Sequence, residues 1–290
     1  MTAVQELTGS AGRYVKTRRI KFSFRSPDKI PKYFVDGDVA MSHLVAILSA
    51  GFPPGEEAFI RSVHHYNDRI TDPTLKEQVK GFIGQEMSHG REHRNLNDTL
   101  QEMGYPVHAI DKGGEVLLPV LERFVPAQLP LALTAAAEHF TATLAARVLS
   151  EREYVDSVAH DEDVKGVLNW HAFEELEHKA VAFDVYRAMG GSEALRIGAM
   201  LVSLPGGVGF SLLGMVFSMA LDADARRRPV HTTWRVLSLA RNPLFKGILP
   251  ELATYLRPGF HPDDVDTDPL LEASRDRLFG PQGELARHLA

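Results

Sequence analysis

The sequence predicts an all-α protein, with a four-helix bundle at its centre and additional helices toward the C-terminus. Three observations predict this fold. Helical periodicity dominates residues 36–190, which we expect to form the bundle. Proline- and glycine-rich breaks divide this region into segments of helical length. Two of the segments repeat one pattern of acidic and imidazole side chains, as expected when two helices contribute equivalent ligands to one core.

The breaks delimit the expected helices of the bundle. They fall at Phe52-Pro53-Pro54-Gly55, Thr71-Asp72-Pro73, Gly104-Tyr105-Pro106 and Val125-Pro126. Proline cannot donate a helical hydrogen bond, and it disfavours the helical conformation of the residue before it. We therefore expect helices near 38–50, 55–70, 74–103, 127–156 and 160–189.

Two further segments flank the bundle. Residues 1–35 form an N-terminal arm, in which Ile20, Phe22 and Phe24 alternate with polar residues as in a short extended segment. Residues 191–290 form a C-terminal extension of further helices. Short helices are expected in it near 231–239, 248–255 and 268–279.

The extension contains an apolar segment, residues 199–221, which carries no charged side chain and is soon followed by three arginines at 226–228. Its length and its basic flank are compatible with a membrane span. However, a Pro-Gly-Gly sequence at 205–207 interrupts it, and no second segment of this kind occurs. We therefore favour a pair of helices that is buried or lies at a membrane surface, with true bilayer contact as the alternative.

The composition excludes several classes of function. The 32 basic and 38 acidic residues give a formal net charge of -6 without a long basic block, so nucleic acid is not expected as a partner. The absence of cysteine excludes disulfides, thiolate zinc sites, iron–sulfur clusters and cysteine nucleophiles, so any metal must be held by oxygen and imidazole nitrogen. No secretory signal is recognisable, and we expect a cytoplasmic protein that associates with a membrane if segment 199–221 contacts one.

The repeated pattern is Glu-x-x-His, found as Glu86 with His89 and again as Glu175 with His178. Residues three apart share one face of a helix, about 4.5 Å apart along the axis at about 1.5 Å per residue, so both side chains can reach one metal ion. In four-helix two-metal proteins, two helices each supply such a pair and the other two each supply a glutamate. The sequence therefore predicts a pair of bound metal ions.

Single glutamates occur on the two remaining helices. Glu138 is the only acidic residue in the stretch "PLALTAAAEHFTATLAARVL", where an unpaired carboxylate would be costly to bury. On the first helix, the stretch "PPGEEAFIRSVHHY" offers Glu56 or Glu57. The order along the chain is then Glu, Glu-x-x-His, Glu, Glu-x-x-His, which amounts to two repeats of a helix pair.

The histidines outside the repeated pattern are not equally strong candidates for metal ligands. His171 stands about one turn before the second Glu-x-x-His pair and, at about 100° per residue, falls on the same face, which predicts a further ligand. His93 stands two turns after Glu86 and shares the face of the first pair, so it could be a further ligand or an outer partner of one. A solvated position beside charged neighbours is favoured for it, as it is for His64 and His65. His139 points about 100° away from the glutamate before it and is not expected to be a ligand.

The alternative to a metal site is a set of solvated or ion-paired side chains. A single Glu-x-x-His arises easily by chance and usually lies on a solvated surface. Two copies on separate helices, combined with glutamates in apolar helices, favour the metal site. Glu92, Glu174 and Glu177 either orient ligands through hydrogen bonds or form salt bridges with basic residues, and the sequence is compatible with both.

At these residues the sequence resembles a bacterial family of predicted metal-dependent hydrolases within the ferritin-like superfamily. The matching stretches are "FPPGEEAFIRSVHHYNDRITDP", "FIGQEMSHGREH", "AAAEHFTA", "WHAFEELEHKAVAFDVY" and "YLRPGFHPDD", spread over about residues 20–270. The resemblance implies a ferritin-like bundle. The Gly-Glu-x-x-Phe pattern of the family selects Glu56 rather than Glu57 as the ligand on the first helix.

The ligand pattern also resembles that of di-iron N-oxygenases of aryl amines, which carry an additional histidine four residues before the last Glu-x-x-His. His171 matches that histidine. The resemblance implies seven metal ligands, which are Glu56, Glu86, His89, Glu138, His171, Glu175 and His178.

These observations favour a di-iron enzyme that activates dioxygen, as co-substrate, to oxidise or oxygenate a small substrate that is hydrophobic or an amine. Two iron ions are expected, with manganese or a mixed iron–manganese pair as alternatives. The rival hypotheses are a metal-dependent hydrolase that uses a metal-activated water and a non-catalytic metal-binding protein. Symmetric ligands on helices favour redox chemistry, whereas a hydrolase more often adds a base and a polar cleft. The sequence does not identify the electron donor, and it is compatible with a homodimer.

Overall fold

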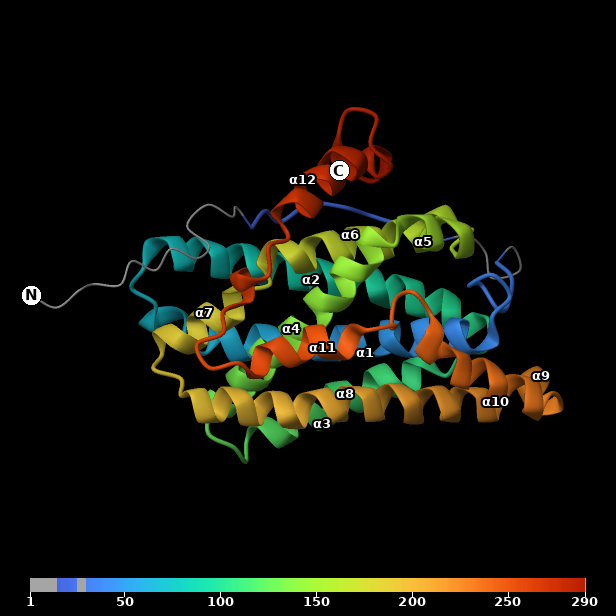
Figure 1. Cartoon of the computed structure of the whole chain (residues 1–290), viewed down its shortest axis with the longest axis horizontal. Coiled ribbons are helices and arrows are strands. Elements are labelled where there is room, and N and C mark those ends of the chain that lie inside the picture. The colour runs from blue at the N-terminus through green and yellow to red at the C-terminus, as the bar shows by residue number, and fades with distance from the viewer. Residues whose placement is uncertain (1–14, 25–29, 290) are drawn as a thin grey trace, which may run out of the picture.

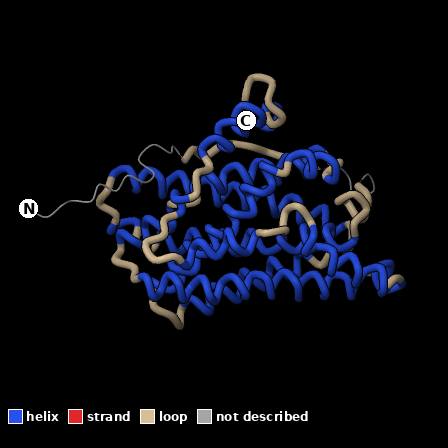
Figure 2. The backbone as a smooth tube through the Cα atoms, viewed as in Figure 1, coloured by secondary structure: helices blue, strands red, loops and turns tan. Residues whose placement is uncertain are grey.

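A computed structural model describes residues 15–24 and 30–289, and every regular element within them is helical. Pairing of β type in these residues is limited to two isolated bridges, Ile20 with Leu289 and Val35 with Ala159. The longest helices run roughly along one direction and give the molecule an elongated body (Figures 1 and 2). The prediction of an all-α fold is confirmed.

Four long helices form the centre of the molecule: α1 (Val39–His64), α2 (Pro73–Glu102), α4 (Gln128–Ser150) and α6 (Glu162–His178). α1 packs on α2 and α4, and α6 packs on the same two helices, so the four enclose a common interior. Three of the helices begin after an aspartate, Asp38, Asp72 or Asp161, whose side chain accepts hydrogen bonds from N–H groups of the first turn. The helices predicted to carry the ligands are therefore neighbours in space.

α1 runs unbroken through Pro53 and Pro54, so the predicted break between 38–50 and 55–70 is wrong. Proline lacks the N–H that would bond to the carbonyl four residues earlier, which for Pro53 is the carbonyl of Ser49. The side-chain amide of Asn97, on α2, donates to that carbonyl at 3.0 Å. A neighbouring helix thus replaces a missing bond of α1.

Two of the predicted helices are each divided in the structure, and one observed helix was not predicted. α5 (Arg152–Val158) is separate from α4 and begins inside the predicted helix 127–156, and α7 (Val181–Ala188) is separate from α6 within 160–189. α3 (Val107–Glu122) forms in a segment for which no helix was predicted.

The division between α6 and α7 lies next to His178, the last residue of α6. Lys179 follows it, is 3% exposed, and donates to Val265 O at 2.6 Å and to Thr267 Oγ1 at 3.1 Å. A buried ammonium group is costly unless it is paired and hydrogen-bonded. These bonds therefore hold the C-terminal tail against the end of α6.

α8 (Glu193–Leu221) is one continuous helix, so the predicted division at 205–207 is wrong. Pro205 lies on the exposed side, where water can solvate the carbonyl that it leaves without a helical partner. Within the described residues, α8 is the one helix that is long and apolar enough to cross a membrane. It packs along α1 and α4, but only 11% of its most apolar window is buried. The buried form of the favoured expectation is therefore wrong, and the form that lies at a membrane surface stays a prediction.

The C-terminal part contains α9 (Ala223–Arg227), α10 (Pro229–Ser238), α11 (Ile248–Leu252) and α12 (Asp268–Phe279). The short helices predicted near 231–239, 248–255 and 268–279 are confirmed by α10, by α11 with the 3₁₀ turn Ala253–Leu256, and by α12. Figure 1 shows α8 and α12 on opposite sides of the molecule.

The described part of the N-terminal arm, residues 15–24, lies against the bundle. Ile20 and Phe22 are each 2% exposed. The backbone N–H of Phe22 donates to Glu92 Oε2 on α2 at 3.0 Å. The rest of the predicted arm at 1–14 and 25–29 lies outside the described residues.

Candidate metal centre

The structure brings all seven predicted ligands into one buried cluster between the four central helices. α1 contributes Glu56, α2 contributes Glu86 and His89, α4 contributes Glu138, and α6 contributes His171, Glu175 and His178. None of them is more than 5% exposed. The Glu-x-x-His spacing on α2 and α6 therefore directs each pair into the shared interior, as the helical geometry requires.

The Glu175 carboxylate occupies the middle of the cluster. Its Oε1 lies 3.8 Å from His89 Nδ1, 2.9 Å from His171 Nε2 and 3.5 Å from His178 Nε2. One carboxylate oxygen thus stands beside a nitrogen of three different imidazoles, which is the position of a group that can bridge two ions.

Further donors lie close to that carboxylate. His178 Nε2 lies 3.1 Å from Glu86 Oε1 and 3.3 Å from Glu138 Oε2. Glu56 Oε1 lies 3.7 Å from His171 Nε2. The buried donors form overlapping groups of carboxylates and imidazoles, each within the span of one ion.

Glu56 rather than Glu57 points into the cluster, in agreement with the family resemblance. Glu56 is 2% exposed, whereas Glu57 lies outside and accepts a hydrogen bond from Arg94 at 2.8 Å. Gly90 on α2 leaves the space that the Glu56 carboxylate needs, because a Cβ atom there would stand 3.2 Å from Glu56 Oε2. A larger residue at position 90 would press on this carboxylate.

Each of the three predicted histidine ligands turns one ring nitrogen toward the carboxylates and binds an outer partner with the other. The outer pairs are His89 Nε2 with Glu174 Oε2 (3.1 Å), His178 Nδ1 with Gln85 Oε1 (2.9 Å) and His171 Nδ1 with His93 Nε2 (2.7 Å). Metal-binding histidines are typically held in this way, because the outer hydrogen bond fixes both the tautomer and the orientation of the ring.

Many of the inward-facing atoms have no hydrogen-bond partner among the described residues. They are both carboxylate oxygens of Glu56, Glu86 and Glu138, Oε2 of Glu175, Nδ1 of His89 and Nε2 of His178. Each such buried group costs about 1–3 kcal/mol, and a charged group costs more. Iron and manganese ions take carboxylate and imidazole donors together, so the residues present fit a pair of such metals.

The ionisation of the cluster agrees with a role in binding cations. Burial raises the pKa of Glu138 to about 7, and it raises the pKa values of Glu56 and Glu86 well above their usual range. Burial alone would lower the pKa of His178, but the nearby carboxylates of Glu138 and Glu175 raise it. The cluster thus retains protons in the absence of a cation, and metal binding would release them.

Arg18, from the N-terminal arm, joins the outer partners of the two Glu-x-x-His histidines. Its guanidinium donates to Glu174 Oε1 at 2.8 Å and, as a fork, to both carboxylate oxygens of Glu177 at 2.6 and 2.7 Å. Glu177 also accepts from Gln85 Nε2 at 2.9 Å. Glu174 therefore both binds a predicted ligand, His89, and forms a salt bridge with Arg18. Glu177 does the same indirectly, because it pairs with Arg18 and holds Gln85, the partner of His178. Glu92 instead binds the arm backbone and Arg91.

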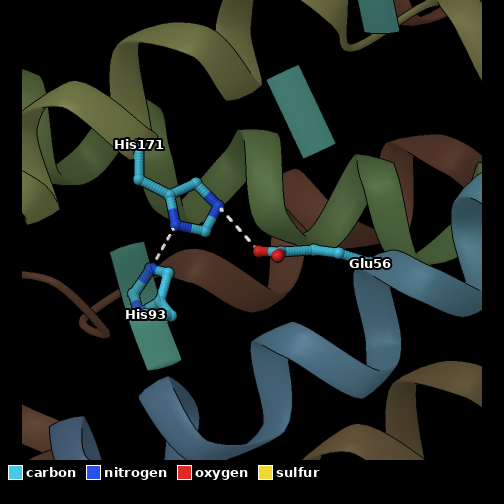
Figure 3. A group of neighbouring side chains, drawn as sticks. All are labelled: Glu56, His93 and His171. Atoms are coloured by element: carbon cyan, nitrogen blue, oxygen red, sulfur yellow. Dashed lines mark hydrogen bonds and ion pairs between the residues drawn. The ribbon is translucent and has the colours of Figure 1, made fainter. Parts of the chain in front are cut away.

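The solvated position favoured for His93 is wrong, because its side chain is 0% exposed. Figure 3 shows His93, His171 and Glu56 directed toward one another. His93 Nδ1 lies 2.9 Å from Ser49 Oγ, whose hydroxyl donates to Asn97 Oδ1 at 2.8 Å. His93 Nδ1 therefore donates to Ser49 Oγ, so His93 Nε2 is the acceptor and His171 Nδ1 donates to it. The other nitrogen of His171, Nε2, then faces the carboxylates. His93 thus orients the ring of His171, and it lies close enough to belong to one group of possible metal ligands with His171 and Glu56.

The remaining histidines considered from the sequence lie outside the cluster, as expected. His64 and His65 are exposed at the end of α1. His139 turns toward α11, with its Nε2 3.4 Å from Glu251 O, and burial lowers its pKa to about 4. It is therefore a neutral packing residue.

A hydrogen-bonded chain of three side chains joins Ser218, His43 and Asp222. Its order resembles that of a nucleophile, a base and an acid that orients the base. His43 Nδ1 lies 2.7 Å from Ser218 Oγ, and His43 Nε2 lies 3.2 Å from Asp222 Oδ2. A nucleophile must be reached by its substrate, but Ser218 is 1% exposed and His43 is 2% exposed. This hydrogen-bonded chain joins α1 to the end of α8 and serves packing.

An apolar cavity of about 130 Å³ adjoins the cluster of buried histidines and glutamates. Glu175, His171 and His93 form part of its wall. Apart from these cluster residues, the lining is aliphatic or aromatic except at Ser49 and Thr141. A small apolar molecule in this cavity would lie directly beside the ligands.

Comparison with known protein families shows that residues 16–266 match a family described as predicted metal-dependent hydrolase. No curated protein and no solved structure matches the chain. The description of the family agrees with the metal dependence inferred from the buried histidine and glutamate groups. It names hydrolysis, which corresponds to the rival hypothesis and not to oxygen activation. Because the match spans most of its length, the chain belongs to this family of predicted metal-dependent hydrolases.

Proposed function

We propose that this protein is an enzyme built on a two-metal centre in a ferritin-like bundle, with the seven predicted residues as ligands. The orientation of the three histidines carries the proposal. Each presents one nitrogen to a group of unpartnered carboxylate oxygens, while a hydrogen bond from outside fixes the other nitrogen. Seven ligand residues are too many for one ion and suit a bridged pair.

The oxygen and imidazole donors suit iron or manganese. When bound, the metals would supply either electrons for the reduction of dioxygen or the Lewis acidity that activates water. The chain itself supplies geometry and a dry environment. Glu174, Gln85 and His93 fix the three imidazole rings, and the helices exclude bulk water from the carboxylates.

The cavity favours oxidation of a small apolar molecule by dioxygen as the reaction. Side chains such as Phe140 and Leu144 would hold an apolar substrate by shape and by exclusion of water. A hydrolase that acts on esters, amides or phosphates needs polar groups placed at the substrate oxygens. Beyond the cluster residues, this cavity offers the hydroxyls of Ser49 and Thr141 for that purpose.

Hydrolysis is the second candidate, because the description of the family names it. The same carboxylates and imidazoles could hold metals that activate water, and the proposed ligand set is common to both reactions. The two candidates differ in whether dioxygen is consumed, so they can be separated by experiment.

Oxygen uptake and hydrolysis can be measured on the same preparation. Protein loaded with ferrous iron under anaerobic conditions should consume dioxygen after mixing, and faster when a small apolar substrate is present. It should not cleave nitrophenyl esters or phosphates. Glu56→Gln should lose oxygen uptake, whereas the matched variant Glu57→Gln should keep it, because Glu57 faces Arg94 outside the cluster.

Two results would change the assignment. Metal-dependent cleavage of esters or phosphates that is lost in Glu56→Gln, without oxygen uptake, would assign hydrolysis. Loaded protein that shows neither activity would contradict both candidates and support the hypothesis of a non-catalytic metal-binding protein.

A further inference from the structure

Helix α8 presents a broad apolar surface to the outside of the molecule. The exposed side chains include Leu201, Val202, Val208, Leu212, Leu213 and Val216. Leu213 is the most exposed of them, at 73%. Soluble proteins rarely leave a continuous apolar surface of this extent without a partner. Figure 1 shows that α8 runs along one long edge of the molecule, where such a partner can reach it.

The opposite side of α8 is packed on the bundle along its length. Met200, Met215 and Met219 are buried, and the helix contacts α1 and α4. At Gly214 the helix approaches α1 so closely that a Cβ atom would stand 2.6 Å from Ile47 Cγ2. A helix held in this way cannot cross a bilayer without exposing the core, but its outer side can lie against one.

A basic segment follows α8. Residues 222–246 contain six basic and two acidic residues, although the whole chain has a formal net charge of -6. Arg226, Arg227 and Arg228 are consecutive and exposed. The one acidic neighbour of Arg227 in the described structure is the exposed Asp224, at 3.4 Å. Positive charge is therefore concentrated at one end of the apolar surface.

α10, which follows these arginines, adds exposed apolar side chains. Val230, Trp234 and Leu237 are 84%, 57% and 69% exposed. Their spacing of four and three residues places them on one face of the helix. Tryptophan is enriched where an apolar phase meets water, because its ring is amphipathic. The combination of apolar side chains, tryptophan and arginines is typical of a membrane surface site.

We propose that the exposed side of α8, together with α10 and Arg226, Arg227 and Arg228, docks on the surface of an anionic lipid membrane, with α8 parallel to the bilayer. The apolar side chains enter the boundary between headgroups and acyl chains, and the arginines meet anionic headgroups. A second copy of the chain is a poorer occupant, since it would bring the same cluster of exposed arginines to the interface. The proposal does not depend on the chemistry of the metal centre.

Vesicle flotation with the full chain tests this proposal. Vesicles of phosphatidylcholine with phosphatidylserine are compared with vesicles of phosphatidylcholine alone, at low and high salt. The wild type should float with the anionic vesicles and dissociate as salt rises, because salt screens exposed charges. The triple variant Arg226→Gln, Arg227→Gln and Arg228→Gln should bind these vesicles on the order of 100-fold more weakly.

Variants at the apolar side chains of α8 test the apolar part of the proposed docking surface. The double variant Leu213→Glu and Val216→Glu places charges at exposed positions, so it should fold normally and lose flotation even at low salt. Met87→Glu is its matched control, because Met87 is an exposed apolar residue on α2. Lys76→Gln with Lys80→Gln removes exposed positive charge from α2 and is the control for the arginines. Both controls should float like the wild type.

Four results would overturn the proposal. The first is a wild type that floats with neither kind of vesicle, and the second is flotation that the arginine and apolar variants retain in full. The third is a concentration-dependent dimer that does not bind vesicles and that Leu213→Glu with Val216→Glu dissociates, which would assign the surface to a second copy. The fourth is retention in the bilayer after alkaline carbonate extraction, which would assign a spanning helix.

Discussion

Replacing Glu138 by glutamine should remove metal from one or both positions and yet make the metal-free protein more stable. Glu138 is 0% exposed, and within the described structure neither of its carboxylate oxygens has a hydrogen-bond partner. Without metal, glutamine removes a buried charge, which should stabilise the fold by about 1–3 kcal/mol. With metal, the same change removes a ligand. Elemental analysis and thermal unfolding of metal-free and loaded protein measure the two effects.

The gain in stability of the Glu138→Gln protein should depend on pH. Burial raises the pKa of Glu138 in the folded, metal-free protein to about 7, from an ordinary value of 4.5. A carboxyl with a higher pKa in the folded state destabilises the fold as pH rises from the unfolded value to the folded value. Wild type and variant should therefore be about equally stable below pH 4.5, diverge up to about pH 7, and differ by a constant amount above it.

Glu57→Gln is the control for both effects, since Glu57 lies outside the cluster. A metal-free Glu138→Gln protein that is less stable than the metal-free wild type at neutral pH would contradict this account. It would mean that the Glu138 carboxylate makes a net stabilising contact with His178 in the absence of metal.

Removing Arg18 should weaken metal binding by about 10- to 100-fold although no ligand is lost, because outer partners orient ligands with effects of this size. The Arg18 side chain is 10% exposed and is paired with the buried Glu174 and Glu177. Arg18→Ala leaves both carboxylates without that partner, and breaking a buried pair in this way costs about 3–5 kcal/mol. Arg18→Lys keeps the charge but loses the forked geometry, so it should restore only part of the affinity.

Competition with a chelator, together with circular dichroism, measures the metal affinity and the fold of the Arg18 variants. Arg91→Ala is the matched control, because Arg91 also lies beside the arm and pairs with Glu92 at 2.8 Å, but its side chain is 55% exposed. It should bind metal as the wild type does. A folded Arg18→Ala protein with unchanged metal affinity would show that the Arg18 network does not orient the ligands.

The members of the buried cluster could be predicted from the sequence because their signals are local. The Glu-x-x-His spacing lies within single helices, and Glu138 stands out as an acid in an apolar stretch. His93 could not be placed in the same way. Its charged neighbours Arg91 and Arg94 suggested a solvated helix face, whereas the structure buries it against Ser49 and His171, which lie on other helices.

Contacts between distant segments explain the other errors. The helix continues through Pro53 because Asn97, on another helix, binds the carbonyl that the proline leaves free. Arg18 reaches Glu174 across 156 residues of sequence, and no local pattern indicates where the arm lies. The sequence also could not predict that α8 is exposed, because an apolar run of this length looks the same in a buried helix and in a helix at a membrane.

The number of metal ions bound per chain tests the central claim most directly. Metal-free protein titrated anaerobically with ferrous iron should saturate at two ions per chain and release protons as it does so, because the buried carboxylates and imidazoles around Glu175 offer more donors than one ion can take. Saturation at a single ion, or no binding by a folded protein, would contradict the two-metal centre.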